Sequence, residues 1–175
     1  MTAAGPSGAG SGEALAGELV ATLTRQGRTL AVAESLTGGA LCAALVSVPG
    51  ASACVRGGVV AYATDLKESL LGVPAALLGS VGAVHPDTAR AMASGARSRL
   101  GADLGVATTG VAGPDPQDGR PVGEVHIALC DERGCEVVTL HESPSSARAA
   151  VREAAVLAAL ALLVRRSAAA AAPGE

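Results

Sequence analysis

Apolar residues recur at two different spacings along the chain, and the two spacings alternate. Residues 13–26 carry apolar side chains three or four positions apart, as on one face of an amphipathic helix, and Gly27 follows as a helix-ending residue. Residues 29–33 form a short apolar run, which is typical of a buried strand. The first part of the chain therefore predicts a helix followed by a strand. The apolar positions of this helix are Leu15, Leu19, Val20 and Leu23.

The alternation continues to the C-terminus. We predict a hairpin at residues 131–134 and expect Asp87 near the N-cap of one helix. A chain that alternates helices with strands and ends in one hairpin predicts an α/β fold, here a single three-layer α/β/α domain with a mixed, partly parallel sheet. The further helices are predicted at residues 38–48, 65–71, 87–100 and 145–166. The further strands are predicted at residues 55–63, 104–108, 123–129 and 136–141.

The length and composition agree with one globular domain. The chain has 175 residues, of which 49% are hydrophobic and 17% are charged. We place the domain at residues 12–166. The flanking residues 1–11 and 167–175 are rich in small residues, and we expect both segments to be disordered.

Charge and aromatic content exclude several classes of partner. The formal net charge is −3, no long basic run occurs, and aromatic residues make up 1% of the chain, with Tyr62 as the single tyrosine. A nucleic-acid binder needs positive charge and stacking groups that this chain lacks. The most apolar run, residues 154–164, is too short for a membrane-spanning helix, and the N-terminus has no basic or apolar region of a secretory signal. We therefore expect a cytoplasmic protein with no nucleic-acid or membrane partner.

The four cysteines show no CxxC spacing and lie in apolar or strand-like surroundings. This pattern favours buried, reduced thiols over zinc ligands or a disulfide framework, and we predict no metal site. The cysteines are Cys42, Cys54, Cys130 and Cys135.

Two loops that follow predicted strands combine hydroxyl side chains with glycines. One comprises residues 35–39 and the other residues 108–114. In an open α/β sheet, ligands bind at the carboxyl ends of the strands, and glycines let backbone N–H groups approach an anion. If the two loops face each other, they form a polar pocket for a phosphate or an oxyanion, although such turns also occur as plain connections. The candidate residues are Ser35, Thr37, Gly38, Gly39, Thr109, Gly110 and Gly113.

The only lysine of the chain, Lys67, lies five residues after its only tyrosine, Tyr62. Unlike arginine, lysine loses its proton when its surroundings disfavour charge. This pairing suits a Ser/Lys hydrolase in which Lys67 takes the proton of Ser35 and Tyr62 relays or positions it. Such a base requires the ammonium to be destabilised by roughly 4 kcal/mol. The alternative at this point is a solvated lysine on a helix surface. The three histidines, at positions 85, 126 and 141, are scattered and match no Ser-His-Asp arrangement.

Several short blocks, taken in order, resemble the CinA C-terminal domain family, whose stand-alone members are nicotinamide-nucleotide amidohydrolases (PncC). The resemblance covers residues 13–163, and Lys67 matches the family as well. The blocks are AESLTGG (33–39), PGAS (49–52), GGVVAY (57–62), LGV (71–73), GAV (82–84), TGVAGP (109–114) and PVG (121–123).

The resemblance implies hydrolysis of nicotinamide mononucleotide to nicotinate mononucleotide and ammonia, without a metal or other cofactor. Ser35 matches the nucleophile of the family, Lys67 the general base and Tyr62 the tyrosine beside them. We expect amides near the helix start to hold the oxyanion and residues 109–113, with Thr37 and Arg148, to hold the phosphate; the reverse assignment of the two loops stays open at this point. The family also leads us to expect a small-molecule nucleotide as partner and a homodimer. Further residues that match polar positions of the family site are Ser52, Thr109 and Arg148.

The chain departs from the family pattern at three places. Leu36 stands where the family usually has Cys, His85 where Ser is frequent, and residues 145–147 lack the usual Gly-Asp before Arg148. An alternative hypothesis from another class is a catalytically silent module of the CinA type that binds a nucleotide or phosphate without turnover.

Overall fold

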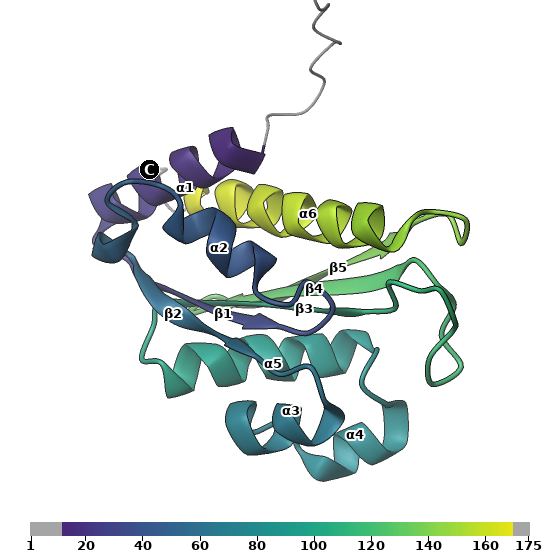
Figure 1. The fold of residues 1–175 in the computed structure, drawn as a ribbon. Coiled ribbons are helices and arrows are strands. Elements are labelled where there is room, and N and C mark those ends of the chain that lie inside the picture. Colours follow the sequence, from purple (N-terminus) through teal and green to yellow (C-terminus); the bar gives the residue numbers. More distant parts are fainter. Residues whose placement is uncertain (1–11, 170–175) are drawn as a thin grey trace, which may run out of the picture.

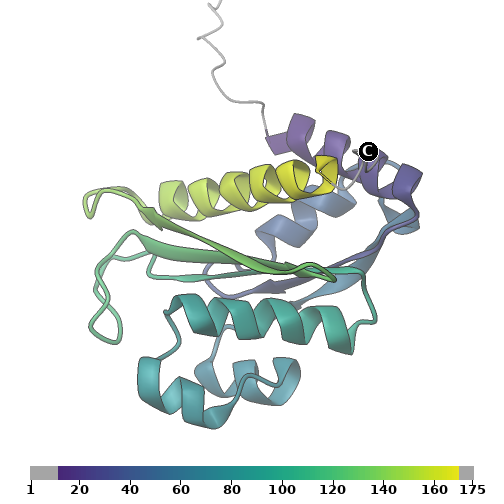
Figure 2. The same ribbon diagram turned by 180° about the vertical axis from the view of Figure 1, so that it is seen from behind.

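The computed structural model describes residues 12–169, which fold into three layers. A five-stranded sheet in the order β2-β1-β3-β4-β5 forms the middle layer. Helices α1, α2 and α6 cover one face, and α3, α4 and α5 lie on the other (Figures 1 and 2). The helices are α1 (Gly12–Gln26), α2 (Ala40–Val46), α3 (Thr64–Leu71), α4 (Ala75–Val81), α5 (Pro86–Arg99) and α6 (Arg148–Ala168), with a 3-10 turn η1 (Ala51–Ala53). The strands are β1 (Leu30–Glu34), β2 (Val55–Val60), β3 (Leu104–Gly110), β4 (Glu124–Asp131) and β5 (Gly134–His141).

The sheet is mixed, which confirms the predicted fold class. Strand β1 lies in the middle of a parallel set and pairs with β2 on one side and β3 on the other. Strand β4 runs antiparallel to β3 and forms the predicted hairpin with β5. Every residue of β1 is buried, because helices pack on both faces of the sheet. The carboxyl ends of β1 and β3 consequently lie next to each other at one edge of the fold.

Helices α2, α4 and α6 differ from the prediction, and α6 begins at Arg148 rather than at residue 145. Helix α4 was not predicted, because its seven residues are too few to repeat an apolar spacing, although Leu77 and Leu78 pack against the core. Helix α2 begins at Ala40 rather than at residue 38, since Gly38 and Gly39 adopt φ angles of +61° and +96°. The N-cap of α5 is His85, whose Nδ1 accepts the backbone N–H of Asp87, so Asp87 lies in the first turn, near the cap as predicted.

The predicted domain boundary at residue 166 is also corrected. Helix α6 continues to Ala168, and Ser167 is fully buried against the domain. Residues 167 and 168 therefore belong to the helix and not to a tail. The predicted N-terminal tail, residues 1–11, and residues 170–175 lie outside the described residues.

The expectation of four reduced thiols was wrong for two of them. Cys130 and Cys135 form a disulfide across the β4–β5 hairpin. The antiparallel register places the two residues directly opposite each other, with Cα atoms 4.1 Å apart. A five-residue spacing alone does not reveal that register. Cys42 and Cys54 are free, and burial raises the pKa of both thiols.

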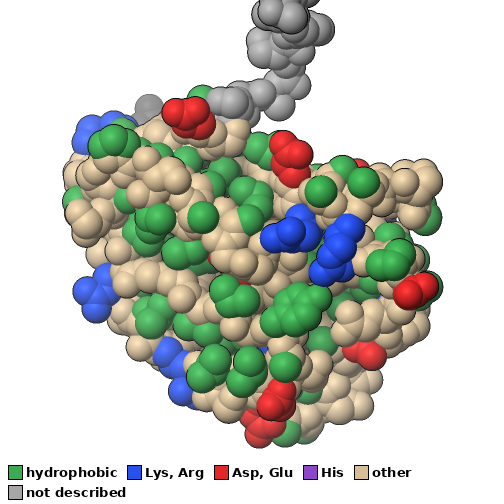
Figure 3. All heavy atoms as spheres, viewed as in Figure 1, with side chains coloured by type: hydrophobic (Ala, Val, Ile, Leu, Met, Phe, Trp, Pro, Cys, Tyr) green, Lys and Arg blue, Asp and Glu red, His purple; other side chains and the backbone are tan. Residues whose placement is uncertain are grey.

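The basic side chains on one face of the described part are scattered. On the face shown in Figure 3, Lys and Arg side chains lie in small separate groups rather than in a continuous patch. Among residues 12–169, no helix is long and apolar enough to cross a membrane, and no cluster of His, Cys, Asp and Glu has the arrangement of a metal site.

Candidate active site

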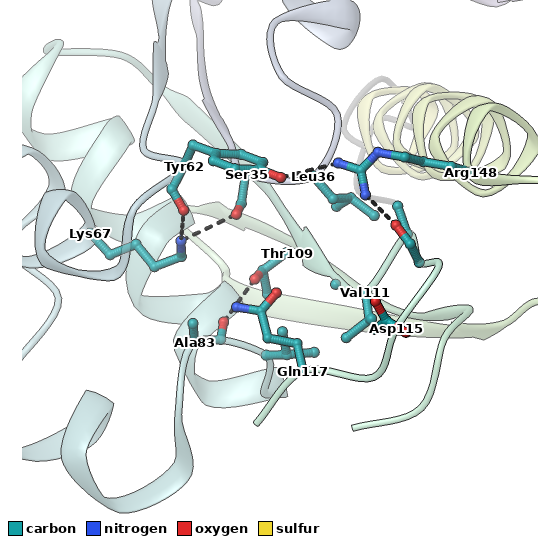
Figure 4. A pocket seen from close by; sticks show the side chains of 14 residues that line it. Ser35, Leu36, Tyr62, Lys67, Ala83, Thr109, Val111, Asp115, Gln117 and Arg148 are labelled. Carbon is teal, nitrogen blue, oxygen red and sulfur yellow. Dashed lines mark hydrogen bonds between the residues drawn. The ribbon is translucent and has the colours of Figure 1, made fainter. Parts of the chain in front are cut away.

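A pocket opens where β1 and β3 end, and both glycine-containing loops contribute to it (Figure 4). The two loops face each other, as the sequence predicted. The cavity encloses about 100 Å³, less than a typical small-molecule pocket, so only the reacting end of a larger ligand fits inside. The lining residues are Ser35, Leu36, Tyr62, Lys67, Ala83, Val84, Thr109, Gly110, Val111, Ala112, Gly113, Asp115, Gln117 and Arg148.

Lys67 and Ser35 are in direct contact inside this pocket. The Nζ atom of Lys67 lies 3.2 Å from Ser35 Oγ, and the two side chains point toward each other in Figure 4. Nζ also donates to the carbonyl oxygens of Ala61, at 2.8 Å, and Tyr62, at 3.3 Å. Only 1% of Lys67 is exposed, which rules out the alternative of a solvated surface lysine.

The position of Lys67 follows from the local structure of α3. Residues 61–63 leave strand β2, and α3 begins at Thr64 with Lys67 and Leu71 on its buried face, four residues apart. The backbone N–H of Ala61 donates to the carbonyl of Glu34 at the end of β1, which ties this segment to the strand that precedes Ser35. The position of Lys67 on α3 therefore places its amine next to Ser35.

Burial changes the acid–base behaviour of this amine. Removal from water lowers the pKa of Lys67 to about 8, while the carboxylates of Asp118 and Asp65 act in the opposite direction and raise it. A group with this pKa is neutral in about one molecule in ten at pH 7. An ordinary lysine is neutral in only about one in 2,500. The pocket thus supplies a usable base at neutral pH.

Tyr62 and Arg148 meet at the mouth of the pocket. Arg148 donates from Nη2 to the Tyr62 hydroxyl, at 3.1 Å, and from Nη1 to the carbonyl of Gly113, at 2.6 Å. The hydroxyl of Tyr62 points to Arg148, and the ring is 61% exposed. The contact of Tyr62 with Lys67 is made by its backbone carbonyl, so the structure does not place the hydroxyl as a relay between Ser35 and Lys67.

Thr109 lies on the pocket wall opposite this pair. Its hydroxyl donates to the carbonyl of Ala83, at 2.7 Å, which ties the end of β3 to the segment before α5. Gly110 and Gly113 line the same wall. These three predicted residues, together with Arg148, are therefore gathered around Ser35 and Lys67.

The start of α2 is not open to a ligand, contrary to the prediction for Gly38 and Gly39. Neither glycine lines the pocket, and the carboxylate of Glu34, which is 1% exposed, already accepts hydrogen bonds from this helix end. Its donors are the backbone N–H groups of Gly39 at 2.9 Å, Leu41 at 3.1 Å and Cys42 at 2.8 Å. The side chain of Glu34 thus accepts the N–H of Gly39, and the N–H of Gly38 donates to the carbonyl of Ser35, so both amides already have partners.

Thr37 and Ser52 are also outside the pocket. Thr37 is fully buried, and its hydroxyl pairs with that of Thr108, at 2.7 Å, so its role is to hold the loop against β3. Ser52 lies on η1 and lines a separate surface hollow with Val46 and Pro49. Neither residue lines the pocket that holds Ser35 and Lys67.

Sequence reasoning missed three polar residues around the site. Asp115 and Gln117 line the pocket from the loop after β3, just beyond the predicted segment 108–114. Arg152 donates to the carbonyls of Leu36 and Thr37. Its sequence signal was its position four residues after Arg148, on the same face of the last helix.

Comparison with known proteins identifies the family of this chain. Residues 12–167 match the family described as the CinA C-terminal domain. The chain belongs to this family. A CinA-like protein of Frankia casuarinae is 51% identical over 156 residues, which are 89% of this chain and 36% of that protein. A CinA-like protein of Geobacter sulfurreducens is 49% identical over 84% of this chain and 36% of its own length. The chain thus spans about a third of the curated relatives that it matches.

Solved structures of CinA proteins share the fold. The competence/damage inducible protein CihA from Agrobacterium tumefaciens superposes with a TM-score of 0.85 at 36% identity, over 94% of this chain and 98% of that chain. A CinA superfamily protein from Klebsiella pneumoniae superposes with a TM-score of 0.86 at 31% identity, over 91% and 99% of the two chains.

Two of the positions at which this CinA domain departs from the family pattern have structural explanations. Leu36 is 3% exposed and packs into the core on the α1, α2 and α6 side of the sheet. His85 caps α5 with its ring nitrogen, as a serine hydroxyl does at an N-cap. Neither departure removes a group that contacts Ser35 or Lys67.

Proposed function

We propose that this CinA domain is an amidohydrolase that converts nicotinamide mononucleotide to nicotinate mononucleotide and ammonia by a Ser/Lys mechanism. Ser35 is the nucleophile and Lys67 is the general base. The observation that carries the proposal is the direct contact between a buried lysine nitrogen and a serine hydroxyl at the end of a parallel strand.

The hydrogen bonds of Lys67 orient its reactive side. A neutral amine has two N–H groups and one lone pair. When the carbonyls of Ala61 and Tyr62 accept the two N–H groups, the lone pair is left for the proton of the Ser35 hydroxyl. The same nitrogen then holds the proton close to the leaving group. This arrangement suits a base that must take up and return one proton in each half-reaction.

The reaction proceeds in two steps. Ser35 Oγ bonds to the carboxamide carbon while its proton moves to Lys67, and the C–N bond then breaks as Lys67 returns the proton to the departing nitrogen, releasing ammonia. Water attacks the resulting ester while Lys67 accepts a proton from it, and the ester C–O bond then breaks as Lys67 returns that proton to Ser35 Oγ, giving the carboxylic acid and free Ser35. Backbone N–H groups of the pocket wall at Leu36, Ala112 and Gly113 are our candidates for the oxyanion, whereas the N–H of Val111 donates to the carbonyl of Glu124.

The shape of the pocket supports a substrate whose amide end enters and whose charged end stays outside. The enclosed volume of about 100 Å³ accepts the carboxamide and part of its ring. At the mouth, the exposed guanidinium of Arg148 is placed for the phosphate, and the exposed Tyr62 ring offers a face for the sugar or the ring.

Ammonia release tests the proposal. The wild-type chain is expected to release ammonia from nicotinamide mononucleotide, and Ser35→Ala and Lys67→Ala each lower kcat by at least about 1,000-fold, because the nucleophile and its base act as a unit. Circular dichroism of both variants verifies the fold, and Ser98→Ala, on the exposed surface of α5 and outside the pocket, is the matched serine control with unchanged turnover.

The catalytically silent alternative makes a different prediction. A wild-type chain that binds the mononucleotide in calorimetry but releases no ammonia would support a binding module instead. Full activity of Lys67→Ala would remove the lysine from the mechanism even if ammonia is released.

A further inference from the structure

The turn that carries Ser35 is held from two sides by side chains of opposite charge. Glu34 accepts the N–H groups at the start of α2, as described above. On the other side, Arg152 donates from Nε to the carbonyl of Leu36, at 3.0 Å, and from Nη2 to the carbonyl of Thr37, at 2.8 Å. The two residues after the nucleophile are therefore tied to α6, a helix more than a hundred residues further along the chain.

The two hydrogen bonds donated by Arg152 hold the turn after Ser35 in a fixed orientation. A guanidinium is planar, and two bonds donated from one fork fix both the distance and the orientation of the groups that accept them. Arg152 is half-buried, so neither bond is fully exposed to competition from water. A lysine at the same position would offer a single flexible ammonium and could not hold both carbonyls in one plane.

Arg148 and Arg152 lie one helical turn apart but contact different parts of the site. Arg148 lines the pocket and contacts Tyr62 and Gly113. Arg152 is not among the residues that line the pocket, and its contacts are backbone carbonyls of the nucleophile turn. Arg152 therefore acts on turnover through the turn that holds Ser35 and not through the lining of the pocket by its own side chain.

We propose that Arg152 is a positioning residue that fixes the Ser35 hydroxyl in line with the amine of Lys67 by tying the carbonyls of Leu36 and Thr37 to α6. This inference rests on the proposed function. Misplacement of a reacting group by about 1 Å can cost about 100-fold in rate. Loss of Arg152 is accordingly expected to act on kcat and leave substrate binding in place.

The test compares Arg152→Ala with Arg165→Ala, an arginine of the same helix that is 60% exposed and pairs with Glu136 away from the pocket. We expect Arg152→Ala to lower kcat by about 10- to 100-fold with KM changed by less than about threefold. Added guanidinium salt is expected to restore part of the rate in Arg152→Ala but not in Lys67→Ala. Arg165→Ala is expected to keep the wild-type kcat.

A second measurement does not depend on amide turnover. A fluorophosphonate reacts with an activated serine by forming an O–P bond to Ser35 and releasing fluoride, while the serine proton passes to the base. Intact-mass analysis is expected to show that Arg152→Ala slows this labelling by about the same factor as kcat. If Arg152→Ala fails to fold, Arg152→Gln, which keeps packing and one amide donor, replaces it with the same expectation.

The outcomes separate this inference from the proposed function. A wild-type chain that labels at Ser35 but releases no ammonia contradicts only the amidase function, and slower labelling of Arg152→Ala still supports the positioning role. Labelling and kcat within about twofold of wild type in the folded variant would overturn the role of Arg152, as would a change confined to KM.

Discussion

Lys67 differs from an ordinary lysine because opposing effects act on one nitrogen. Burial removes water from the ammonium and lowers its pKa, whereas the carboxylates of Asp118 and Asp65 stabilise the charge and raise it. Burial is the larger effect, and the pKa settles at about 8. At pH 7 a fraction of Lys67 is therefore neutral and can accept a proton. The ammonium that results is stable enough to form readily.

This balance predicts the effect of Asp118→Asn. Removal of the carboxylate removes a cause that raises the pKa of Lys67, so the pKa falls and the neutral fraction at pH 7 grows. In a pH profile of kcat/KM, the midpoint of the acidic limb is expected to move to lower pH. Asp65→Asn is expected to move it in the same direction by a smaller amount, because Asp65 is the weaker cause.

Asp87→Asn is the control for that experiment, since Asp87 pairs with Arg90 on α5 and is not among the causes that shift Lys67. Its pH midpoint is expected to equal that of the wild type. A midpoint that rises or stays unchanged in Asp118→Asn would show that this carboxylate does not act on the base.

The packing of α5 depends on close approach of the backbone. A Cβ added at Gly95 of α5 would lie 1.9 Å from the carbonyl oxygen of Leu71, at the end of α3. A Cβ at Gly105 of β3 would lie 2.1 Å from the carbonyl oxygen of Ala93. Two small positions thus let α5 sit close to both α3 and the sheet, and α3 is the helix that carries Lys67.

Gly95→Ala is therefore expected to destabilise the fold despite the higher helix propensity of alanine. The new methyl group meets backbone, which cannot move aside as a flexible side chain can, and the expected loss is about 1–3 kcal/mol or more in the free energy of unfolding. Urea denaturation with circular dichroism measures it.

Gly79→Ala is the matched helix variant, because nothing lies within 4 Å of the added Cβ on α4. It is expected to gain up to about 1 kcal/mol from helix propensity. Equal stabilities of the two variants would contradict the close approach of α5 and α3.

The three layers together bring distant segments of the chain to one pocket. Ser35 follows β1, Lys67 comes from α3 on one face, and Arg148 comes from α6 on the other. The fold thereby encloses an amine that would otherwise be solvated, and the whole domain bears the free-energy cost of that burial.

That cost makes stability depend on pH. Between pH 8 and 10.5, Lys67 is mostly neutral in the folded state, while the unfolded chain still binds the proton at the ordinary pKa of 10.5. The unfolded state then binds more protons, so the free energy of unfolding rises with pH through this window. Below about pH 8 both states are protonated, and the folded state carries the full cost.

Lys67→Met isolates this effect, because it removes the titrating group and keeps most of the side-chain volume. As pH rises, the free energy of unfolding of the wild type is expected to increase relative to that of Lys67→Met. This relative increase approaches about 3 kcal/mol over the complete titration of Lys67. Urea denaturation of both proteins at several pH values between 7 and 10 measures the difference. Parallel curves would mean that Lys67 has an ordinary pKa in the folded state.

Much of the fold could be predicted from local patterns. Helical and strand-like spacings located the five strands and all helices except α4, whose seven residues are too few to repeat an apolar spacing. The glycines after β1 and β3 indicated the two loops of the pocket, and the single lysine indicated its base. Local spacing carries such information because secondary structure and strand-to-helix loops depend mainly on neighbouring residues.

Contacts between distant segments could not be predicted in this way. The side chain of Glu34 accepts hydrogen bonds from backbone N–H groups at the start of α2, where the sequence predicts an oxyanion site. Cys130 and Cys135 meet because of the register of a hairpin. Ser52, despite its family motif, lies in another hollow. Each outcome depends on how elements pack, which no local pattern reports.

The amino-acid sequence alone determined the order of helices and strands, because periodicity and residue type act over a few neighbours. It also determined a candidate serine, the single lysine and the two glycine-containing loops. The sequence did not determine whether the lysine nitrogen is shielded from water and within hydrogen-bond distance of the serine. Only the packing of α3 against the ends of β1 and β3 removes water from that amine, and only this burial makes it a base at neutral pH.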